Sequence, residues 1–237
     1  MNASRRSIFR QLSLPKSIVV SLSILAHKLF DENCSSSYAQ CGEDRLLLQA
    51  VDDAPSDFYV ELGCNHPTSL SNTYLLYQMG WRGVCVDANQ AMIDAFRRAR
   101  PKDMAICACI GDAPGRVSFS ITKDPALSHV SSAEIVHERA GEEVKRVTLD
   151  VKTVQELLEE NRVPERFGLL SIDLEGFDMA ALRSFDIRRW RPFLILIEIH
   201  KLDLEQCGNH EIVVYLRESG YKLIAYNMTN ALFRDNA

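Results

Sequence analysis

The sequence contains no hydrophobic run long enough to predict a membrane-spanning helix. Its apolar N-terminal stretch, residues 17–30, is short and is interrupted by His27 and Lys28. A transmembrane helix needs roughly 18 or more consecutive apolar residues. A basic segment before an apolar stretch is also found in signal peptides, but no small-residue cleavage site follows here, so we do not predict secretion.

Paired cysteines and an overall excess of basic residues are lacking as well. None of the 7 cysteines forms a C-x-x-C pair, and several lie inside apolar runs. We therefore expect reduced, buried thiols rather than disulfides or a zinc site, as is typical of a cytoplasmic protein. The net charge of −5 gives no indication of a nucleic-acid partner.

Residues 1–36 differ from the rest of the chain by their basic charge. The basic residues before the first acid, Asp31, are Arg5, Arg6, Arg10, Lys16 and Lys28. We predict that this extension is an amphipathic helix packed on the domain. The alternative is a basic helix in residues 1–30 that contacts a membrane surface. Residues 37–237 are sufficient for one domain with a full core.

From Asp57 onward, short apolar runs alternate with helical patterns. We expect strands at residues 58–62, 83–87, 104–110, 116–122, 144–149, 167–173, 193–199, 221–226 and 231–234, and helices at 70–79, 90–100, 151–161, 179–185 and 210–219. Residues 123–143 are polar without a clear period and predict an excursion between core elements. The alternation predicts an α/β fold with a mostly parallel central sheet and helices on both faces.

In an open parallel sheet, ligands bind at the carboxyl ends of the strands. The first predicted strand ends in Glu61-Leu62-Gly63 and the second ends in Asp87. Gly63 permits a tight turn and a close approach of backbone to ligand. An acid at the end of the second strand can accept hydrogen bonds from both ribose hydroxyls. This pair of strand ends predicts a nucleoside-binding site.

The turn after the first strand lacks the G-x-G-x-x-G pattern of dinucleotide-binding proteins. It contains Gly63 but no further glycine up to Pro67. An acid just before the turn would repel a pyrophosphate, whereas it suits the positively charged methionine end of S-adenosylmethionine. The pattern therefore favours S-adenosylmethionine over NAD. Taken singly, Glu61 could be a strand-end charge that reaches solvent, and Asp87 a helix N-cap.

Several segments, in this order along the chain, resemble the FkbM-type methyltransferases. They are YAQCGED (38–44), FYVELG (58–63), SNT (71–73), GWRG (80–83), VDAN (86–89) and IDLEG (172–176). The resemblance runs from about Tyr38 to the C-terminus. It implies a class I Rossmann-like fold, S-adenosylmethionine as cofactor, and O-methylation of a hydroxyl on a sugar or natural-product acceptor.

The sequence departs from the family pattern in the first turn. The family commonly has Asp where Glu61 stands, Glu where Asp87 stands, and a further glycine near His66-Pro67. The acid exchanges conserve charge. With the resemblance, the expected cofactor-binding residues are Glu61, Gly63, Asn65, Asn72, Asp87, Ala88, Gly111, Asp112 and Asp173.

Methyl transfer to a hydroxyl requires alignment of the acceptor oxygen and benefits from a base that takes its proton. The candidate catalytic residues are Asp173, Glu175 and His200, which follow two predicted central strands. On an extended segment Asp173 and Glu175 would face the same way. Alternatively, both acids cap the helix that starts near residue 177, or they bind magnesium together with Glu198. The preferred interpretation has no metal.

Two other classes of protein have this kind of sheet. One is an NAD-dependent oxidoreductase, against which the missing glycine pattern counts. The other is a non-catalytic nucleoside-binding protein, against which the acids at every relevant strand end count. A fold alone does not distinguish them.

Overall fold

The computed structural model describes residues 36–122, 129–130 and 143–236, and all of these from Tyr38 onward belong to the compact unit Tyr38–Ala237. The helix expected within residues 1–36 lies outside the described residues, except for Ser36, and so does most of the excursion expected at 123–143. Among the residues that are described, none forms a helix long and apolar enough to cross a membrane.

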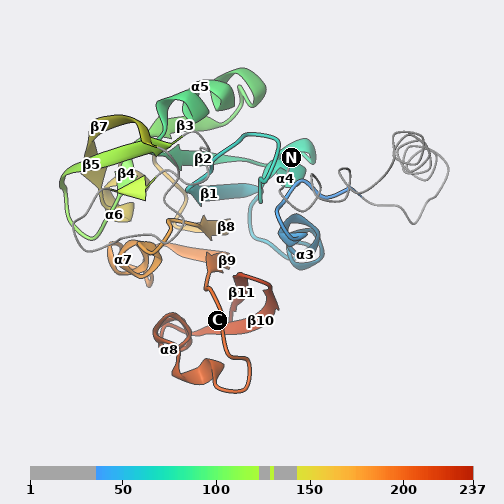
Figure 1. The fold of residues 1–237 in the computed structure, drawn as a ribbon. Coiled ribbons are helices and arrows are strands. Elements are labelled where there is room, and N and C mark those ends of the chain that lie inside the picture. Colours follow the sequence, from blue (N-terminus) through green and yellow to red (C-terminus); the bar gives the residue numbers. More distant parts are fainter. Residues whose placement is uncertain (1–35, 123–128, 131–142, 237) are drawn as a thin grey trace, which may run out of the picture. The chain divides into compact units, whose positions relative to one another are not determined.

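The central sheet has seven strands in the order β10-β11-β9-β8-β1-β2-β3 (Figure 1). They are β1 (Phe58–Leu62), β2 (Arg82–Asp87), β3 (Met104–Cys107), β8 (Arg166–Ile172), β9 (Arg191–Glu198), β10 (Tyr221–Asn227) and β11 (Asn230–Asp235). The strands from β9 to β3 are parallel, and β11 is antiparallel to both of its neighbours. The predicted α/β fold with a mostly parallel sheet is confirmed.

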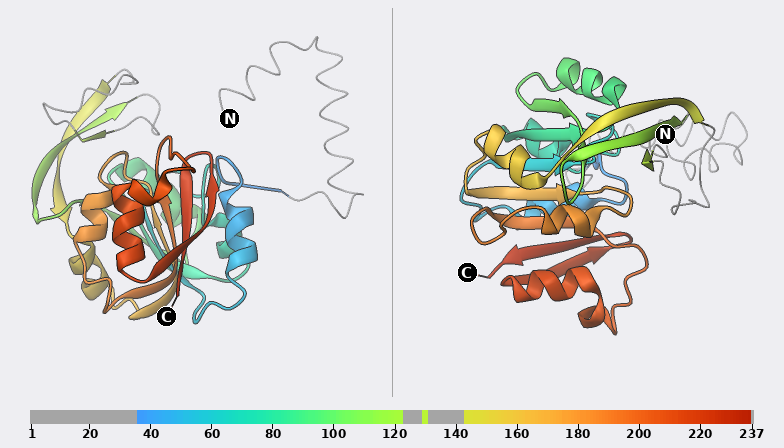
Figure 2. Two further views of the ribbon diagram at one scale, coloured as in Figure 1. Left: turned by 90° about the horizontal axis from the view of Figure 1, so that it is seen from below. Right: turned by 90° about the vertical axis from the view of Figure 1, so that its left-hand side faces the viewer.

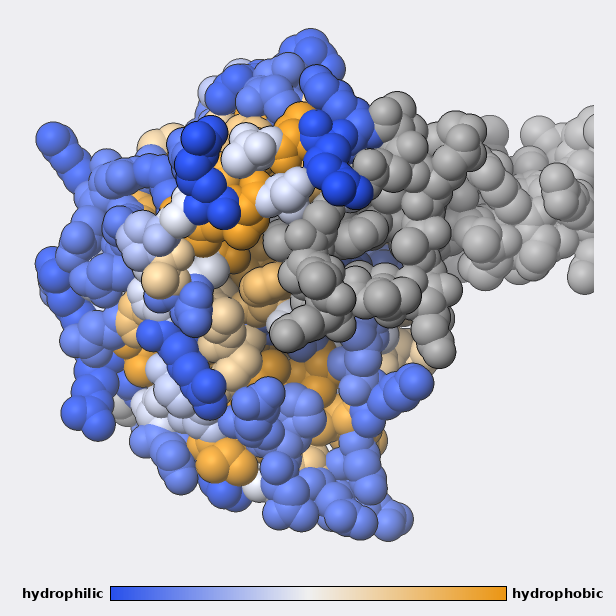
Figure 3. Space-filling view, turned by 60° about the vertical axis from the view of Figure 1, so that its left-hand side comes forward, coloured by the Kyte–Doolittle hydropathy of each residue, from blue (hydrophilic) through white to orange (hydrophobic). Residues whose placement is uncertain are grey.

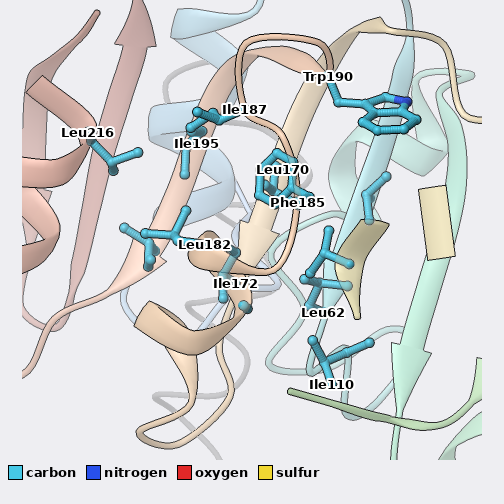
Figure 4. Close-up of a cluster of buried hydrophobic side chains, with 14 of the residues drawn as sticks. Leu62, Ile110, Leu170, Ile172, Leu182, Phe185, Ile187, Trp190, Ile195 and Leu216 are labelled. Carbon is cyan, nitrogen blue, oxygen red and sulfur yellow. The ribbon is translucent and has the colours of Figure 1, made fainter. Parts of the chain in front are cut away.

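Helices cover both faces of this sheet, as Figure 2 shows. One face packs against α6 (Val154–Glu160), α7 (Asp178–Arg183) and α8 (Glu211–Glu218), and the other against α3 (Glu43–Ala50), α4 (Tyr74–Gln78) and α5 (Gln90–Ala99). A short 3-10 helix, Cys207–Asn209, precedes α8. Alternate residues of one strand serve the two cores, because successive strand side chains point to opposite faces. Val60 and Leu62 belong to the core with α7, of which Figure 4 labels Leu62 and Leu182, whereas Tyr59 belongs to the core with α5.

A second, smaller sheet follows the third strand and was not predicted. Its order is β4 (Cys109–Ile110), β7 (Glu143–Lys152), β5 (Gly115–Thr122) and β6 (His129–Val130). The strand expected over 104–110 is therefore wrong, because it divides at Ala108 between two sheets. The Ala108 amide donates to the Asp87 carbonyl, so the chain stays on β2 until that point.

Several other boundaries differ from the expected ones. The helix expected at 70–79 contains only Tyr74–Gln78, because Leu70 has a positive φ of 56° and breaks the pattern. The helix expected at 151–161 begins after Thr153, whose side chain forms a capping box with Glu156. Helix α3 was not expected from the sequence. The six described cysteines are unbridged, but Cys41 is exposed and not buried as expected.

Candidate functional site

The carboxyl ends of β1, β2 and β8 are joined by backbone hydrogen bonds at one edge of the sheet. The Gly63 and Cys64 amides donate to the Val86 carbonyl, and the Asp173 amide donates to the Leu62 carbonyl. The turn after β1 therefore lies between the ends of β2 and β8. This is the place at which an open α/β sheet binds ligands.

Gly63 is required by packing within this edge. Its φ is 79°, and a Cβ added there would lie 1.8 Å from the Asp173 carbonyl oxygen. From the sequence, a ligand was expected to make this close approach, whereas in the structure the end of the neighbouring strand makes it. The glycine thus brings the first turn against Asp173, so that residues expected to bind the cofactor and residues expected to act on the acceptor meet.

Asp87 connects the loops that follow β1 and β2. Its Oδ2 accepts a hydrogen bond from the Asn65 amide at 2.8 Å, and its Oδ1 accepts one from the Asn89 amide at 2.7 Å. The N-cap of α5 is Asn89, whose side chain accepts from the Ala91 amide, so the capping alternative for Asp87 is wrong. Burial raises the pKa of the Asp87 carboxyl, while the two amides favour its charged form. Each carboxylate oxygen keeps a lone pair for a hydroxyl donor.

Glu61 is 3% exposed, so the alternative in which it reaches solvent is wrong. Its Oε2 accepts a 2.6 Å hydrogen bond from the Thr73 hydroxyl and lies 3.8 Å from the Arg100 guanidinium. Burial raises the pKa of Glu61 to about 6, and Arg100 and Thr73 act in the opposite direction. Glu61 therefore interacts with buried protein groups, which the sequence did not indicate.

The motif at 38–44 and the SNT motif meet beside this turn. The Ser71 amide donates to the Tyr38 carbonyl at 3.1 Å, and the Tyr38 and Tyr74 rings pack edge to face. Asp44, which is fully buried, accepts from the Tyr38 amide. Asn72 is half-buried between Ser71 and Thr73. These two motifs together therefore fix one loop over the end of β1.

A cavity of about 180 Å³ lies at the end of β4. Its lining includes Gly111, Asp112 and Phe177, with Ile110, Val117 and Val151 among the apolar residues around it. It lies on the side of the molecule where β4, β5 and α7 are found, a side on which Figure 3 shows apolar side chains between hydrophilic ones. The cavity does not include Asp87 or Asp173, so it is at most one part of a larger site.

At the ends of β8 and β9, Asp173, Glu198 and His200 form a continuous chain. The Asp173 and Glu198 carboxyl groups are hydrogen-bonded, and Glu198 Oε2 lies 3.2 Å from His200 Nε2. Burial is the main cause that raises the pKa of both carboxyl groups, followed by nearby acids. The pair therefore retains a proton at pH values at which isolated carboxyl groups have lost theirs. The His200 side chain is 58% exposed and forms the solvent end of the chain.

Glu175 does not share a face with Asp173 in the way the sequence suggested. Strand β8 ends at Ile172, and Glu175 is exposed with a φ of 50°, so the segment is not extended. The capping alternative is also wrong, because α7 has no side-chain N-cap. Instead, Asp178 accepts hydrogen bonds from the Leu174 and Gly176 amides and shapes the loop.

Glu175, Glu198 and His200 each bring one possible metal-ligand atom within 4.8 Å of the others. This set differs from the alternative considered for magnesium, in which Asp173 took the place of His200. A carboxylate and imidazole set of this kind is also common without an ion, so the spacing assigns no metal.

Two residues of the site were not expected there from the sequence. Glu198 was considered only as a metal ligand, although its place two residues before His200 at a strand end was a usable signal. Arg100 was not considered at all. It precedes Pro101 at a helix end, where an arginine is usually solvated, and no pattern in the sequence indicates that it is buried.

Comparison with known proteins gives a match to one family model. Residues 61–223, more than half of the chain, match the methyltransferase FkbM domain. No curated protein matches the chain. Among solved structures, a TehB-like SAM-dependent methyltransferase from Corynebacterium glutamicum is similar, with 12% identity, 94% of this chain and 100% of that chain covered, and a TM-score of 0.40. At that score the structural likeness adds nothing to the assignment, which rests on the family match.

Proposed function

Because the chain belongs to the FkbM methyltransferase family, whose cofactor is S-adenosylmethionine, we propose that it methylates a hydroxyl group of a sugar or natural-product acceptor. One observation carries the choice of a hydroxyl. A carboxyl pair with raised pKa values, linked to an exposed imidazole, lies beside the turn that is expected to hold the cofactor. Such a chain suits an acceptor that must lose a proton.

The residues at the edge of the sheet fit S-adenosylmethionine. The two Asp87 oxygens are held by backbone amides and suit the two hydroxyls of a ribose. The cavity with Gly111 and Asp112 has an apolar wall, as sites for small molecules commonly have. The first turn contains one glycine and lacks the G-x-G-x-x-G pattern that holds a pyrophosphate. We assign Asn65, Ala88 and Asn72 to the same binding surface from their places in these loops.

In this proposal Asp173 is the base. S-adenosylmethionine supplies a methyl group already activated by the positive charge on sulfur. Asp173 accepts the hydroxyl proton, the hydrogen bond from Glu198 stabilises the charged form of Asp173, and His200 exchanges protons with solvent. Glu175 contributes negative charge near Asp173.

Isothermal titration of the protein with S-adenosylmethionine, S-adenosylhomocysteine and NAD tests the cofactor site. We expect the first two to bind and NAD not to bind. Asp87→Ala should weaken S-adenosylmethionine binding by about 1.5–3 kcal/mol, the loss of charge-assisted hydrogen bonds. Asp52→Ala, in an exposed turn, is the matched control and should bind as the wild type does. Tight NAD binding without a response to S-adenosylmethionine would contradict the proposal.

The acceptor class is tested by transfer of a radiolabelled methyl group from S-adenosylmethionine to hydroxyl compounds. Each sugar or natural product is paired with its methyl ether at the same position, and only the free hydroxyl should be labelled. Labelling of amines or thiols alone would show that the acceptor atom is not oxygen. Binding without transfer to any acceptor would favour a non-catalytic nucleoside-binding protein.

Cytoplasmic localisation and membrane contact through residues 1–30 remain proposals that rest on the sequence.

A further inference from the structure

Arg100 is a fully buried cation directly after α5, and all of its donor nitrogens are occupied. Its exposed fraction is 0%. On one side Nε donates to Asp103 Oδ2 at 2.7 Å and Nη2 donates to the Tyr59 hydroxyl at 2.6 Å. The guanidinium also lies 4.7 Å from the centre of the Phe96 ring. These contacts fix the guanidinium to the sheet and to α5.

The other side of the guanidinium holds the loop that connects β1 to α4. We call residues 63–73 the cofactor loop. Nη1 lies 3.4 Å from both the Pro67 carbonyl and the Ser71 hydroxyl, and Nη2 donates to the Thr73 hydroxyl at 2.9 Å. One side chain thus holds three points of the cofactor loop, because the five donors of arginine are arranged in a rigid planar fork.

The same contacts reach Glu61 through Thr73. The Thr73 hydroxyl accepts from Arg100 and donates to Glu61 Oε2 at 2.6 Å, and the guanidinium lies 3.8 Å from that oxygen. A buried carboxylate is costly unless a cation and hydrogen bonds compensate it. Arg100 supplies the cation and Thr73, which Arg100 holds, supplies the hydrogen bond, so the end of β1 and the end of the cofactor loop share one buried anchor.

The anchor leaves one side chain of this segment available. Ser71 and Thr73 are buried and contact Arg100, whereas Asn72 between them is half-buried and makes no side-chain hydrogen bond within the part of the chain that the structure describes. A loop that is already ordered loses less conformational entropy when a ligand binds. The contacts of Arg100 with Ser71 and Thr73 order the backbone on both sides of Asn72.

We propose that Arg100 is a positioning residue for cofactor binding: it holds Ser71, Thr73 and Glu61 from beneath the cofactor loop, so that Gly63 and Asn72 meet S-adenosylmethionine in a preformed arrangement. This inference rests on the proposed function. It gives Glu61 a role through Arg100 and Thr73, not through direct contact with the cofactor.

The test compares Arg100→Lys and Thr73→Val with the wild type. Lysine keeps the charge but cannot hold the several partners of the fork. Valine removes only the hydroxyl that joins Arg100 to Glu61, and it keeps the shape of threonine. The affinity for S-adenosylmethionine is measured by titration, folding by circular dichroism and melting temperature, and methyl transfer at saturating cofactor by the labelling assay.

Arg191→Lys is the matched control. Arg191 lies at the amino end of β9, the opposite end from Glu198, and holds Asp235 with two hydrogen bonds of 3.1 and 2.6 Å. It is therefore another largely buried arginine fork, away from the cofactor loop. Its replacement should lower the melting temperature without changing the affinity for S-adenosylmethionine.

We expect both loop variants to bind S-adenosylmethionine about 10- to 100-fold more weakly, with turnover at saturating cofactor within about threefold of the wild type. A lower melting temperature with unchanged affinity, as in Arg191→Lys, would overturn the proposal and leave Arg100 a structural residue. If Arg100→Lys does not fold, Thr73→Val decides by the same criteria. Failure of the wild type to bind S-adenosylmethionine would instead contradict the proposed function itself.

Discussion

Replacement of Glu198 by its neutral isostere should make the protein more stable at alkaline pH. Glu198 contacts the Asp173 carboxyl group, and its side chain is 11% exposed. Burial, and after it the charge of Asp173, raises the pKa of Glu198 above that of a carboxyl group in the unfolded chain. The folded state therefore holds a proton that the unfolded state has released, and stability falls as the pH rises.

The size of the effect follows from this linkage. Each bound proton that distinguishes the two states changes the free energy of unfolding by about 1.4 kcal/mol for each pH unit. Solvent reaches part of the pair, so we expect Glu198→Gln to gain only about 1–3 kcal/mol relative to the wild type between pH 5 and pH 9. For a chain of this length that is a rise of about 2–12 °C in relative melting temperature.

Melting curves of the wild type and Glu198→Gln at several pH values measure this difference. The control is Glu218→Gln at the exposed end of α8, which should melt as the wild type does at every pH. The reasoning is refuted if Glu198→Gln is destabilised equally at pH 5 and pH 9, because Glu198 would then contribute packing or hydrogen bonding and no unfavourable charge.

The remaining predictions concern turnover. Asp173→Asn should lower turnover by about 10²–10⁴-fold with cofactor affinity nearly unchanged, and His200→Gln should lower it less, because solvent can replace a proton carrier; equal turnover in Asp173→Asn and the wild type would exclude Asp173 as the base. Activity should fall as the pH falls below neutral, since burial raises the pKa of Asp173 to about 7. Glu175→Gln removes a charge that raises this pKa, so it should move the acid limb of the rate profile to lower pH; an upward shift would contradict this. A chelator should leave activity unchanged, and loss of activity restored by magnesium would instead assign a metal to Glu175, Glu198 and His200.

The fold class could be predicted from the sequence because its signals are local. Apolar runs and turn residues placed β1 at Phe58–Leu62, as observed, and placed α5 to within one residue of its end. The same patterns located the acids at strand ends. Parallel strands align their carboxyl ends at one edge, so Asp87, Asp173 and His200 were expected at the same edge without knowledge of the packing.

Contacts between distant segments were decided only by the tertiary structure. The chain changes sheets at Ala108, although the apolar run from Met104 to Ile110 continues without a break. Glu61 was expected to face a ligand or solvent, and it is instead paired with a residue 39 positions later in the sequence. Whether an acid is buried, and beside which cation, depends on the elements that pack around it, and no local pattern carries that information.

Asp173 and Glu198 illustrate the physical reason most directly. Asp173 directly follows β8 and Glu198 is the last residue of β9, and the sequence assigns both an ordinary carboxyl group. Their raised pKa values and shared hydrogen bond arise because β8 and β9 are neighbours and hold the two groups together, partly away from water. The sequence determined which groups stand at the sheet edge, and the packing of that edge determined their ionisation, since solvation and charge proximity are properties of the assembled fold.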